Sequence, residues 1–490
     1  MRRKRAKSSN PTNGNVIVYP ANVASIQNST SQPMLSTSAR SYHTLPRRAA
    51  VLANSQSQQA MLSLSTQLAE VRLDTQKSEK FEQNDLVLHN DGTVLSGSRD
   101  ALISRLVPSR DFCPDSSYIF ALLVNVRTFI SPPELMQKIV QYCMFAQNAD
   151  AHNFAKEGRG RMFAHIFRLC SEWATNIPYD FRSEYMRTRL NELLRLCSVD
   201  KSYQHRVTDL QSNLRASLNK LERYEKAHPQ QFDILVGLIT LCPDPKIVAQ
   251  QLAHIEMERF SMVGVDEIVT SLATDDLADI GRHSKAQNGV CSIAFYIEWF
   301  NRLSAFSAIE VLRQTKRRHR VAVVEYLIDV AKECCEIGNF NSMMAIVAGL
   351  SLPSISRLKK TWCRVEKKQA GNSSTSAGPK ADSARANQPK IVIPFFVLLL
   401  KDLFLIYHGS PRSLPNGHLN FLAFAQLADQ LRDVITWKSN VCSFEKNPQV
   451  LQYLLITAVT GEKDSMIMSF ECEPPESSTE REQHKKLKSK

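Results

Sequence analysis

The sequence predicts an all-α protein, and three observations support that prediction. Apolar residues recur at helical spacing along most of the chain from about residue 93, alternating runs typical of strands are scarce, and no fixed-period repeat indicates a solenoid. The 490 residues are enough for two to four domains, and 43% hydrophobic residues are enough for a sizeable core. With 22% charged residues, a wholly disordered chain is excluded.

The first helical region extends from about residue 93 to about residue 228. Apolar spacing predicts helices over residues 100–107, 116–129, 133–145, 161–176 and 181–197. Ser131 is placed to cap the third of these helices, whose apolar residues Leu135, Ile139, Val140 and Cys143 follow helical spacing. The polar, charged stretch 198–229 then predicts one or two exposed helices that lead to the next region.

The second helical region starts near Cys242. Asp244 is expected to cap a helix that has Pro245 in its first turn and continues to Phe260. Further helices are predicted over residues 265–272, 293–312, 322–337 and 341–350, the last opened by an asparagine cap and ended by Gly349. Residues 366–389 are predicted to be a loop, because they consist largely of Ser, Ala, Gly, Lys and Asn and cannot form a core.

The net charge of +13 is concentrated in two stretches. Residues 1–90 carry +6 and residues 353–390 carry +7, so the remaining sequence is neutral and a uniformly basic globular body is excluded. The leader is rich in Ser, Asn, Gln and Thr and is expected to be disordered, with a weak amphipathic helix near residues 61–81. Its basic run, Arg2 to Lys7, is interpreted as a solvated tail, with a nuclear address or a lipid-facing patch as alternatives.

Signals for export, metal binding and phosphate binding are negative. No apolar run follows the basic start, and the apolar stretch 391–407 is shorter than the about 20 residues of a membrane span, so neither a secretory signal nor a transmembrane segment is expected. Eleven cysteines without a C-x-x-C pair indicate buried thiols in a reducing, cytoplasmic compartment. Neither a P-loop nor an H-E-x-x-H motif occurs. The basic run 313–320 is interpreted as a solvated helix end.

The segment from Pro394 to Tyr407 (PFFVLLLKDLFLIY) is apolar on nearly every helical face. A helix of this kind must be covered on all sides. A turn at 408–411 and a second predicted helix over 421–435 complete a helical hairpin. Two arrangements satisfy the requirement: the hairpin lies in the centre of a core, or one face packs on its own domain while the other binds a partner.

Several segments resemble the catalytic domain of Ras-type guanine-nucleotide exchange factors. They are IVAQQLAHIEMERF (247–260), EWFNRLS (298–304), IGNFNSMMAIVAGL (337–350), SRLKKTW (356–362) and IVIPFF (391–396). The run PNGHLNF (415–421), followed by WK at 437–438, is similar to the subfamily called Ras-GEF domain-containing family member 1. Residues 91–215, with DGTVLSGSRDALISRLVP, YIFALLVNVRTFISPPEL and YDFR, resemble the N-terminal Ras exchanger motif domain of that family.

This resemblance implies a domain plan. It comprises a disordered basic leader (1–88), an N-terminal helical Ras exchanger motif domain (89–219), a linker helix (220–241), an α-helical RasGEF catalytic domain (242–475) with the low-complexity insert (366–389), and a charged tail (476–490). The N-terminal domain would pack on the catalytic domain, from which the helical hairpin would protrude.

The resemblance also implies a cytoplasmic guanine-nucleotide exchange factor. It would promote GDP release from a Ras- or Rap-like small GTPase by inserting the hairpin beside the nucleotide site. No covalent bond is made or broken in that process, so the protein would not be an enzyme in the strict sense, and no cofactor, metal or nucleic acid is expected. The basic leader is the candidate for peripheral membrane contact and recruitment.

Site residues carried over by position form two groups. Phe404 stands where the family places an apolar wedge, and His408, one turn later, stands where the family usually has a glutamate. Contacts to the GTPase are expected from Phe395, Phe396, Lys401, Leu405, Met344 and Ser351.

Departures from the family pattern motivate an alternative function. His408 cannot compete as an anion for groups of the phosphate-binding loop of the GTPase. Ser351 and Ser292 stand where asparagines are expected, and residues 366–389 replace a helix-forming segment that completes the family's binding site. Either that wall of the site is lost or the sequence omits an exon. The alternative is therefore a catalytically weak or inactive module that binds GTPases as an adaptor.

Overall fold

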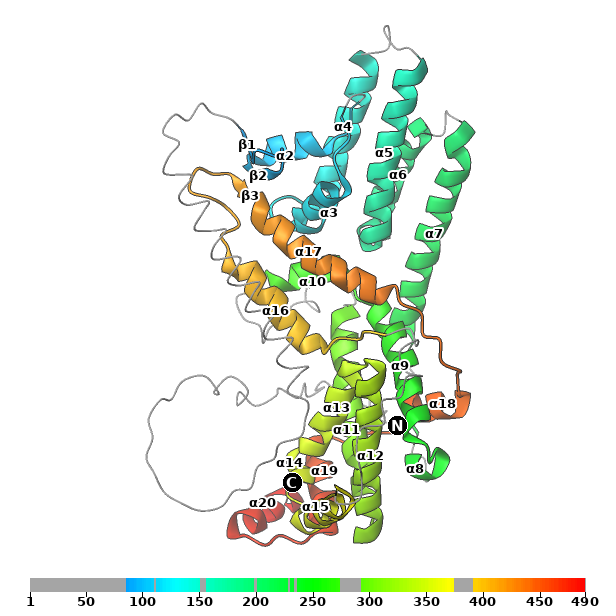
Figure 1. Cartoon of the computed structure of the whole chain (residues 1–490), viewed down its shortest axis with the longest axis vertical. Coiled ribbons are helices and arrows are strands. Elements are labelled where there is room, and N and C mark those ends of the chain that lie inside the picture. The colour runs from blue at the N-terminus through cyan, green and yellow to red at the C-terminus, as the bar shows by residue number, and fades with distance from the viewer. Residues whose placement is uncertain are drawn as a thin grey trace, which may run out of the picture. The chain divides into compact units, whose positions relative to one another are not determined.

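Helices dominate the described part of the chain, as the sequence predicts (Figure 1). The computed structural model describes residues 85–109, 112–149, 156–197, 201–227, 230–232, 236–273, 292–373 and 391–489, all within the unit 81–490. The predictions for most of the leader, for its weak helix and for its basic run lie outside the described residues, as does most of the loop 366–389. The end of the leader is described, and because Leu86–Leu88 form a strand, the prediction of disorder up to residue 88 is wrong there.

The N-terminal helices follow the predicted order. They are α2 (Arg99–Leu106), α3 (Ser116–Asn125), η2 (Val126–Thr128), α4 (Pro132–Ala149), α5 (Lys156–Asn176), η3 (Pro178–Arg182), α6 (Glu184–Cys197) and α7 (Lys201–Lys226). The predicted cap of α4 is confirmed, because the Ser131 hydroxyl accepts from the backbone N–H of Glu134 and the Glu134 carboxylate accepts from that of Ser131. This reciprocal pair is a capping box.

A small antiparallel sheet, which the sequence analysis missed, joins the start of the described chain to the segment just before residue 421. Its strand order is β1 (Leu86–Leu88), β2 (Val94–Gly97) and β3 (Leu419–Asn420). In the second pairing Ser96 lies opposite Asn420 and Gly97 opposite Leu419. Strands of two to four residues are too short to give a readable alternation of apolar and polar residues, so sequence periodicity could not reveal them.

The C-terminal helices form the larger part of the core. They are α8 (Leu238–Leu241), α9 (Pro245–Met262), α10 (Val265–Leu272), α11 (Ser292–Leu312), α12 (Arg317–Ile337), α13 (Phe340–Ser351), α14 (Pro353–Ser356), α15 (Lys359–Ser373), α16 (Phe396–Gly409), α17 (Phe421–Lys438), α18 (Pro448–Ile456), α19 (Glu462–Cys472) and α20 (Ser478–Lys488). Helices α9, α11, α12 and α13 pack together around the buried Phe260, Tyr296 and Trp299. Asp244 caps α9 with Pro245 in its first turn, as predicted.

Two local predictions in this region are wrong. The asparagine cap predicted for α13 is confirmed as Asn339, but Gly349 lies inside that helix instead of ending it. A Cβ atom at Gly349 would overlap the carbonyl oxygen of Ser304 on α11, so this glycine allows close helix packing. The start of the predicted loop 366–389 is helical, because α15 continues to Ser373. Its polar composition does not stop a helix that has already been nucleated by the preceding turn.

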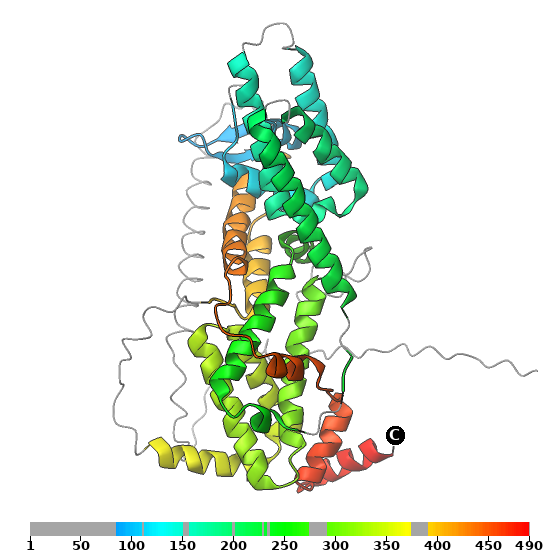
Figure 2. The same ribbon diagram turned by 90° about the vertical axis from the view of Figure 1, so that its right-hand side faces the viewer.

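The N-terminal and C-terminal helices pack on each other through α3 and α17, which places the hairpin helix against the N-terminal region. The two hairpin helices α16 and α17 pack side by side, as both views show (Figures 1 and 2). Helix α7 runs without a break across position 219/220, where the sequence placed the start of a linker helix, and ends at Lys226. The all-α fold with a protruding hairpin is confirmed.

None of the described helices is both long enough and apolar enough to span a membrane. The described cysteines are free thiols, and Cys334 and Cys335 share α12 as predicted. Burial raises the pKa of the Cys334 thiol well above its usual value, so this thiol stays protonated.

Candidate functional site

Helix α16 is apolar on two opposite faces, but only one of them is buried. The inner face consists of Phe396, Leu400, Leu403 and Tyr407, which are at most 8% exposed and recur at helical spacing. The outer face leaves Val397, Leu398 and Leu405 exposed by 43%, 43% and 44%. The central-core arrangement is therefore wrong, because one face of α16 packs on its own domain and the other is uncovered. Binding of a partner on the uncovered face, as in the second arrangement, stays a prediction.

The outer face also carries most of the predicted hairpin residues. Lys401 and His408 are exposed and Phe404 is half-buried. The rings of Phe404 and His408, one turn apart, have centroids 4.2 Å from each other. Together with Leu405, these residues form a mixed apolar and basic surface, which is called the hairpin face below.

Two predicted contact residues occupy the base of the hairpin instead. Phe396 is 2% exposed and packs edge-on against Tyr296, with ring centroids 4.9 Å apart, so its prediction as a GTPase contact is wrong. Its large apolar ring completes the core and cannot reach a partner. Phe395 is half-buried on Phe300, with ring centroids 5.7 Å apart.

The other two predicted contact residues lie on α13. Met344 is half-buried, one turn after Asn341, which contacts the start of α16. Ser351 is exposed at the far end of α13, about 15 Å along the helix from Asn341 at 1.5 Å per residue. Its hydroxyl donates to the Val347 carbonyl, and it lines a groove of about 650 Å³ between α12, α13 and α15. The structure thus separates Ser351 from the hairpin face.

A buried carboxylate, which the sequence analysis did not single out, fixes the base of the hairpin. Glu256 on α9 is 0% exposed, and its oxygens accept from Tyr296 Oη at 2.7 Å and Trp299 Nε1 at 3.0 Å on α11. They also accept from Asn341 Nδ2 at 3.1 Å and Ser342 Oγ at 2.8 Å on α13. Burial raises the pKa of Glu256, whereas these four donor groups lower it.

This network reaches α16 through Asn341. Phe396 is the first residue of α16. Its backbone N–H donates to the side-chain oxygen of Asn341 at 3.2 Å. One signal in the sequence could have revealed it: Glu256 follows Leu252 by one helical turn and therefore falls in the apolar stripe predicted for α9. A carboxylate in such a stripe requires buried donors.

The backbone entering α16 is held by the end of α12. Gly338 has φ of +88° at the C-cap of α12, and a Cβ there would overlap the carbonyl oxygen of Ile391. Ile393 pairs with Asn339 in a parallel bridge. The N–H of Ile393 donates to the Gly338 carbonyl, and the Ile393 carbonyl accepts from the N–H of Phe340, both at 3.0 Å. Only glycine accommodates both the left-handed conformation and the close strand.

The tip of the hairpin is held from two sides. His408 Nε2 lies 3.0 Å from the Leu272 carbonyl at the end of α10, so this nitrogen carries the hydrogen and donates it. Arg412 lies over the Tyr407 ring at 3.8 Å, a cation–π contact, and donates to the Asn125 side-chain oxygen at 3.3 Å. Asn125 in turn donates to the Phe424 carbonyl of α17 at 3.1 Å.

Aromatic stacking completes the contact between α3 and α17. Tyr118 stacks on Phe421 with centroids 4.7 Å apart, and Phe129 stacks on Phe424 with centroids 5.8 Å apart. Such pairs add to the burial of their apolar area, and they fix the direction of α17 relative to the N-terminal helices.

Comparison with known proteins identifies the family to which this fold belongs. The RasGEF domain matches residues 247–425, and the RasGEF N-terminal motif matches residues 93–193. Ras-GEF domain-containing family member 1B of Homo sapiens is 37% identical over 437 residues, covering 82% of this chain and 92% of that protein. Member 1B of Xenopus tropicalis is 37% identical over 443 residues, covering 84% of this chain and 94% of that protein. Member 1C of Mus musculus is 35% identical over 430 residues, covering 81% of this chain and 91% of that protein.

The chain belongs to the Ras-GEF domain-containing family. The RasGEF domain supports a Ras-type exchange factor, whose partner is a Ras-family small GTPase. The match to this domain extends from α9 into α17 and therefore includes both the Glu256 network and the hairpin face.

In this Ras-GEF family protein a second polar cluster fixes α10, the helix that receives His408. Arg182 of η3 forms ion pairs with Glu225 of α7 at 3.3 Å and with Glu267 of α10 at 3.2 Å. Glu267 also accepts from the N–H and the hydroxyl of Ser292, a buried residue at the start of α11. Burial, with Asp266 beside it, raises the pKa of Glu267 to about 7.

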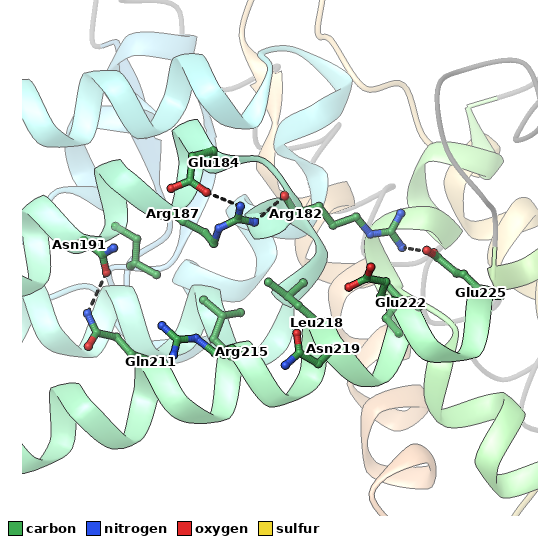
Figure 3. A pocket seen from close by; sticks show the side chains of 13 residues that line it. Arg182, Glu184, Arg187, Asn191, Gln211, Arg215, Leu218, Asn219, Glu222 and Glu225 are labelled. Atoms are coloured by element: carbon green, nitrogen blue, oxygen red, sulfur yellow. Dashed lines mark hydrogen bonds and ion pairs between the residues drawn. The ribbon is translucent and has the colours of Figure 1, made fainter. Parts of the chain in front are cut away.

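A cleft of about 680 Å³ between α6 and α7 lies next to this cluster (Figure 3). Its polar lining residues bond largely to one another, as the dashed lines show: Arg187 to Glu184 at 2.5 Å, Asn191 to Gln211 at 2.8 Å, and Arg182 to Glu225. These hydrogen-bonding groups of the lining are therefore already used in contacts within the protein, and they do not converge on a common point. We assign no function to this cleft.

Proposed function

We propose that the protein accelerates GDP release from a Ras- or Rap-like GTPase by placing the α16–α17 hairpin beside the nucleotide site. The observation that carries this proposal is the uncovered apolar side of α16, with Val397, Leu398 and Leu405 more than 40% exposed. Apolar surface contributes about 25 cal/mol per Å² when it leaves water. A partner that covers this surface only when its nucleotide site is open is thereby shifted towards the open, nucleotide-free state.

The supports of the hairpin suit this role. The Glu256 network and the Gly338 cap hold its base, while His408 and Arg412 hold its tip. Ordering a flexible hairpin on binding would consume part of the binding free energy. A hairpin that is already ordered can apply that free energy to opening the GTPase.

The test is release of labelled GDP from purified Ras and Rap proteins by the full chain. Leu405→Asp should remove the acceleration, because a carboxylate on the hairpin face opposes burial against the partner. Leu88→Asp is the matched control: Leu88 is a leucine of similar exposure, 46% against 44%, that lies on β1 instead of the hairpin. Equal loss in both variants, or no acceleration of any Ras or Rap protein by the unchanged chain, contradicts the proposal.

Phe404 provides a second variant. Phe404→Ala removes the side chain proposed as the wedge, and we expect exchange to be lost while the free energy of unfolding falls only modestly, because this ring is half-buried. A large fall in the unfolding midpoint would instead assign Phe404 to the core of the domain.

One observation favours the alternative, a GTPase-binding adaptor without exchange activity. His408 donates a hydrogen bond to the Leu272 carbonyl, and in this contact the residue serves as a tie between α16 and α10. A glutamate carboxylate cannot donate to a carbonyl. His408→Glu should therefore free the tip and offer an anion to the GTPase, whereas His408→Gln retains a donor. Exchange that appears only in His408→Glu, with GTPase binding in all three proteins, supports the adaptor.

A further inference from the structure

Three basic runs that are distant in sequence meet at one end of the C-terminal helices. They are the start of α12, the first turns of α15, and α20. In both views α15 and α20 lie at the same end of the structure, away from the hairpin (Figures 1 and 2). The start of α12 joins them there, because Arg320 contacts both Thr361 of α15 and Cys472 at the end of α19.

Buried ion pairs hold these three segments together. Arg320 is 2% exposed, donates to the Cys472 carbonyl at 3.2 Å and lies 3.9 Å from Glu473. Glu473 accepts from the backbone N–H groups of Lys360 and Thr361, which begin α15. The base of α12 and the start of α15 thus share one buried carboxylate.

A second ion pair fixes α20. Arg357 donates to Glu480 at 3.1 Å and to the carbonyls of Ser469 and Glu473 at 3.0 and 2.9 Å. Its guanidinium lies 4.2 Å from the centre of the Phe470 ring. Because both guanidinium groups are paired inside the fold, these two arginines organise the end of the structure, and other basic residues face water.

The residues that face water at this end are predominantly basic. Among the described residues they are Lys316, Arg317 and Arg318 of the α12 start, Lys359, Lys360 and Arg364 of α15, and Arg481, Lys485, Lys486 and Lys488 of α20. Against these ten stand four exposed acidic residues on the same segments and on the adjoining stretch from the end of α19 to α20, namely Glu366, Glu471, Glu476 and Glu482, which leaves a net charge of +6. We call this set the basal surface.

We propose that the basal surface docks the protein on an anionic lipid membrane. Its charges come from three separate segments and spread over the whole end of the structure, which suits an extended sheet of negative charge. None of the exposed large hydrophobic residues of the described chain lies on these segments. Trp362 of α15 is half-buried, lines the groove between α12, α13 and α15 and donates to the Ile355 carbonyl, so no exposed aromatic side chain is offered for stacking on nucleic-acid bases. The attraction is electrostatic, without insertion of apolar side chains into the bilayer.

The test is co-sedimentation of the full chain with phosphatidylcholine vesicles that contain phosphatidylserine. Binding should weaken steeply with added salt and should be absent on pure phosphatidylcholine. Two variants alter different segments of the basal surface, Lys485→Glu/Lys486→Glu/Lys488→Glu and Arg317→Glu/Arg318→Glu/Arg364→Glu. Each should lower vesicle affinity by at least about tenfold.

Two triple variants with the same change in net charge serve as controls. Lys201→Glu/Arg215→Glu/Arg223→Glu alters exposed residues of α7 and should retain vesicle binding. Arg2→Glu/Arg3→Glu/Arg5→Glu alters the leader. The proposal is overturned if the leader variant alone abolishes binding, if the α7 variant weakens binding as much as the basal variants, if neutral vesicles bind equally well, or if the chain binds duplex DNA but not anionic vesicles. Exchange on a soluble GTPase should be unchanged in the basal variants, so this test is independent of the proposed exchange activity.

Discussion

Replacing Glu256 by alanine removes the acceptor on which three helices and the start of the hairpin converge. The variant leaves four buried donor groups without a partner: the hydroxyls of Tyr296 and Ser342, the indole N–H of Trp299 and the amide of Asn341. An unpaired buried polar group costs about 1–3 kcal/mol. The expected loss in the free energy of unfolding is therefore at least about 4 kcal/mol, a large share of the about 5–15 kcal/mol typical of a folded domain.

Urea unfolding of the full chain, followed by tryptophan fluorescence, measures this loss. A loss of about 4 kcal/mol lowers the unfolding midpoint by about 1 M or more for a chain of this size. Glu298→Ala is the matched control, because Glu298 is an exposed glutamate on the neighbouring α11, and it should change stability by less than about 0.5 kcal/mol. If Glu256→Ala and Glu298→Ala unfold at the same urea concentration, the network does not hold the fold as derived.

Three further predictions concern packing and pH. Gly349→Ala should destabilise by about 1–3 kcal/mol because its Cβ would overlap the Ser304 carbonyl, whereas Gly409→Ala, with open space around it, should be nearly neutral in the same urea experiment. Asn125→Ala should lower the thermal midpoint and weaken exchange together, since this side chain bonds Arg412 in the turn of the hairpin and the Phe424 carbonyl of α17. The Glu267 pKa of about 7 is raised above 4.5, so its stabilising contribution is present below about pH 4.5 and is lost, by at most about 3 kcal/mol, as pH rises through 7. Glu267→Gln should flatten that part of the stability profile between about pH 5 and pH 8, and an unchanged slope refutes the assignment.

The elements of this protein were largely readable in its sequence. Helix positions follow from apolar spacing, and caps such as Ser131 and Asp244 follow from the hydrogen-bonding groups of single side chains. The quoted motifs were sufficient to indicate the Ras-type exchange factor family, which the domain matches confirm. The hairpin could also be predicted, because residues 394–407 are apolar on nearly every helical face and are followed by a turn and a second apolar helix.

Other features depended on residues that are distant along the chain. Periodicity could not decide which side of α16 is covered, because both sides are apolar, and Phe396 became a core residue only through the position of Tyr296. Neither the short sheet nor the role of Gly349 had a local signal, since both depend on a partner segment.

The sequence by itself thus determined the helices, their caps and the family, because those depend on interactions within a few residues. Only the tertiary structure decided that one apolar face of the hairpin remains uncovered, that Glu256 holds the hairpin base, and that three separate basic runs form one surface. The physical reason is that burial and charge density are properties of a volume, and they are set by whichever distant segments the packing brings into it.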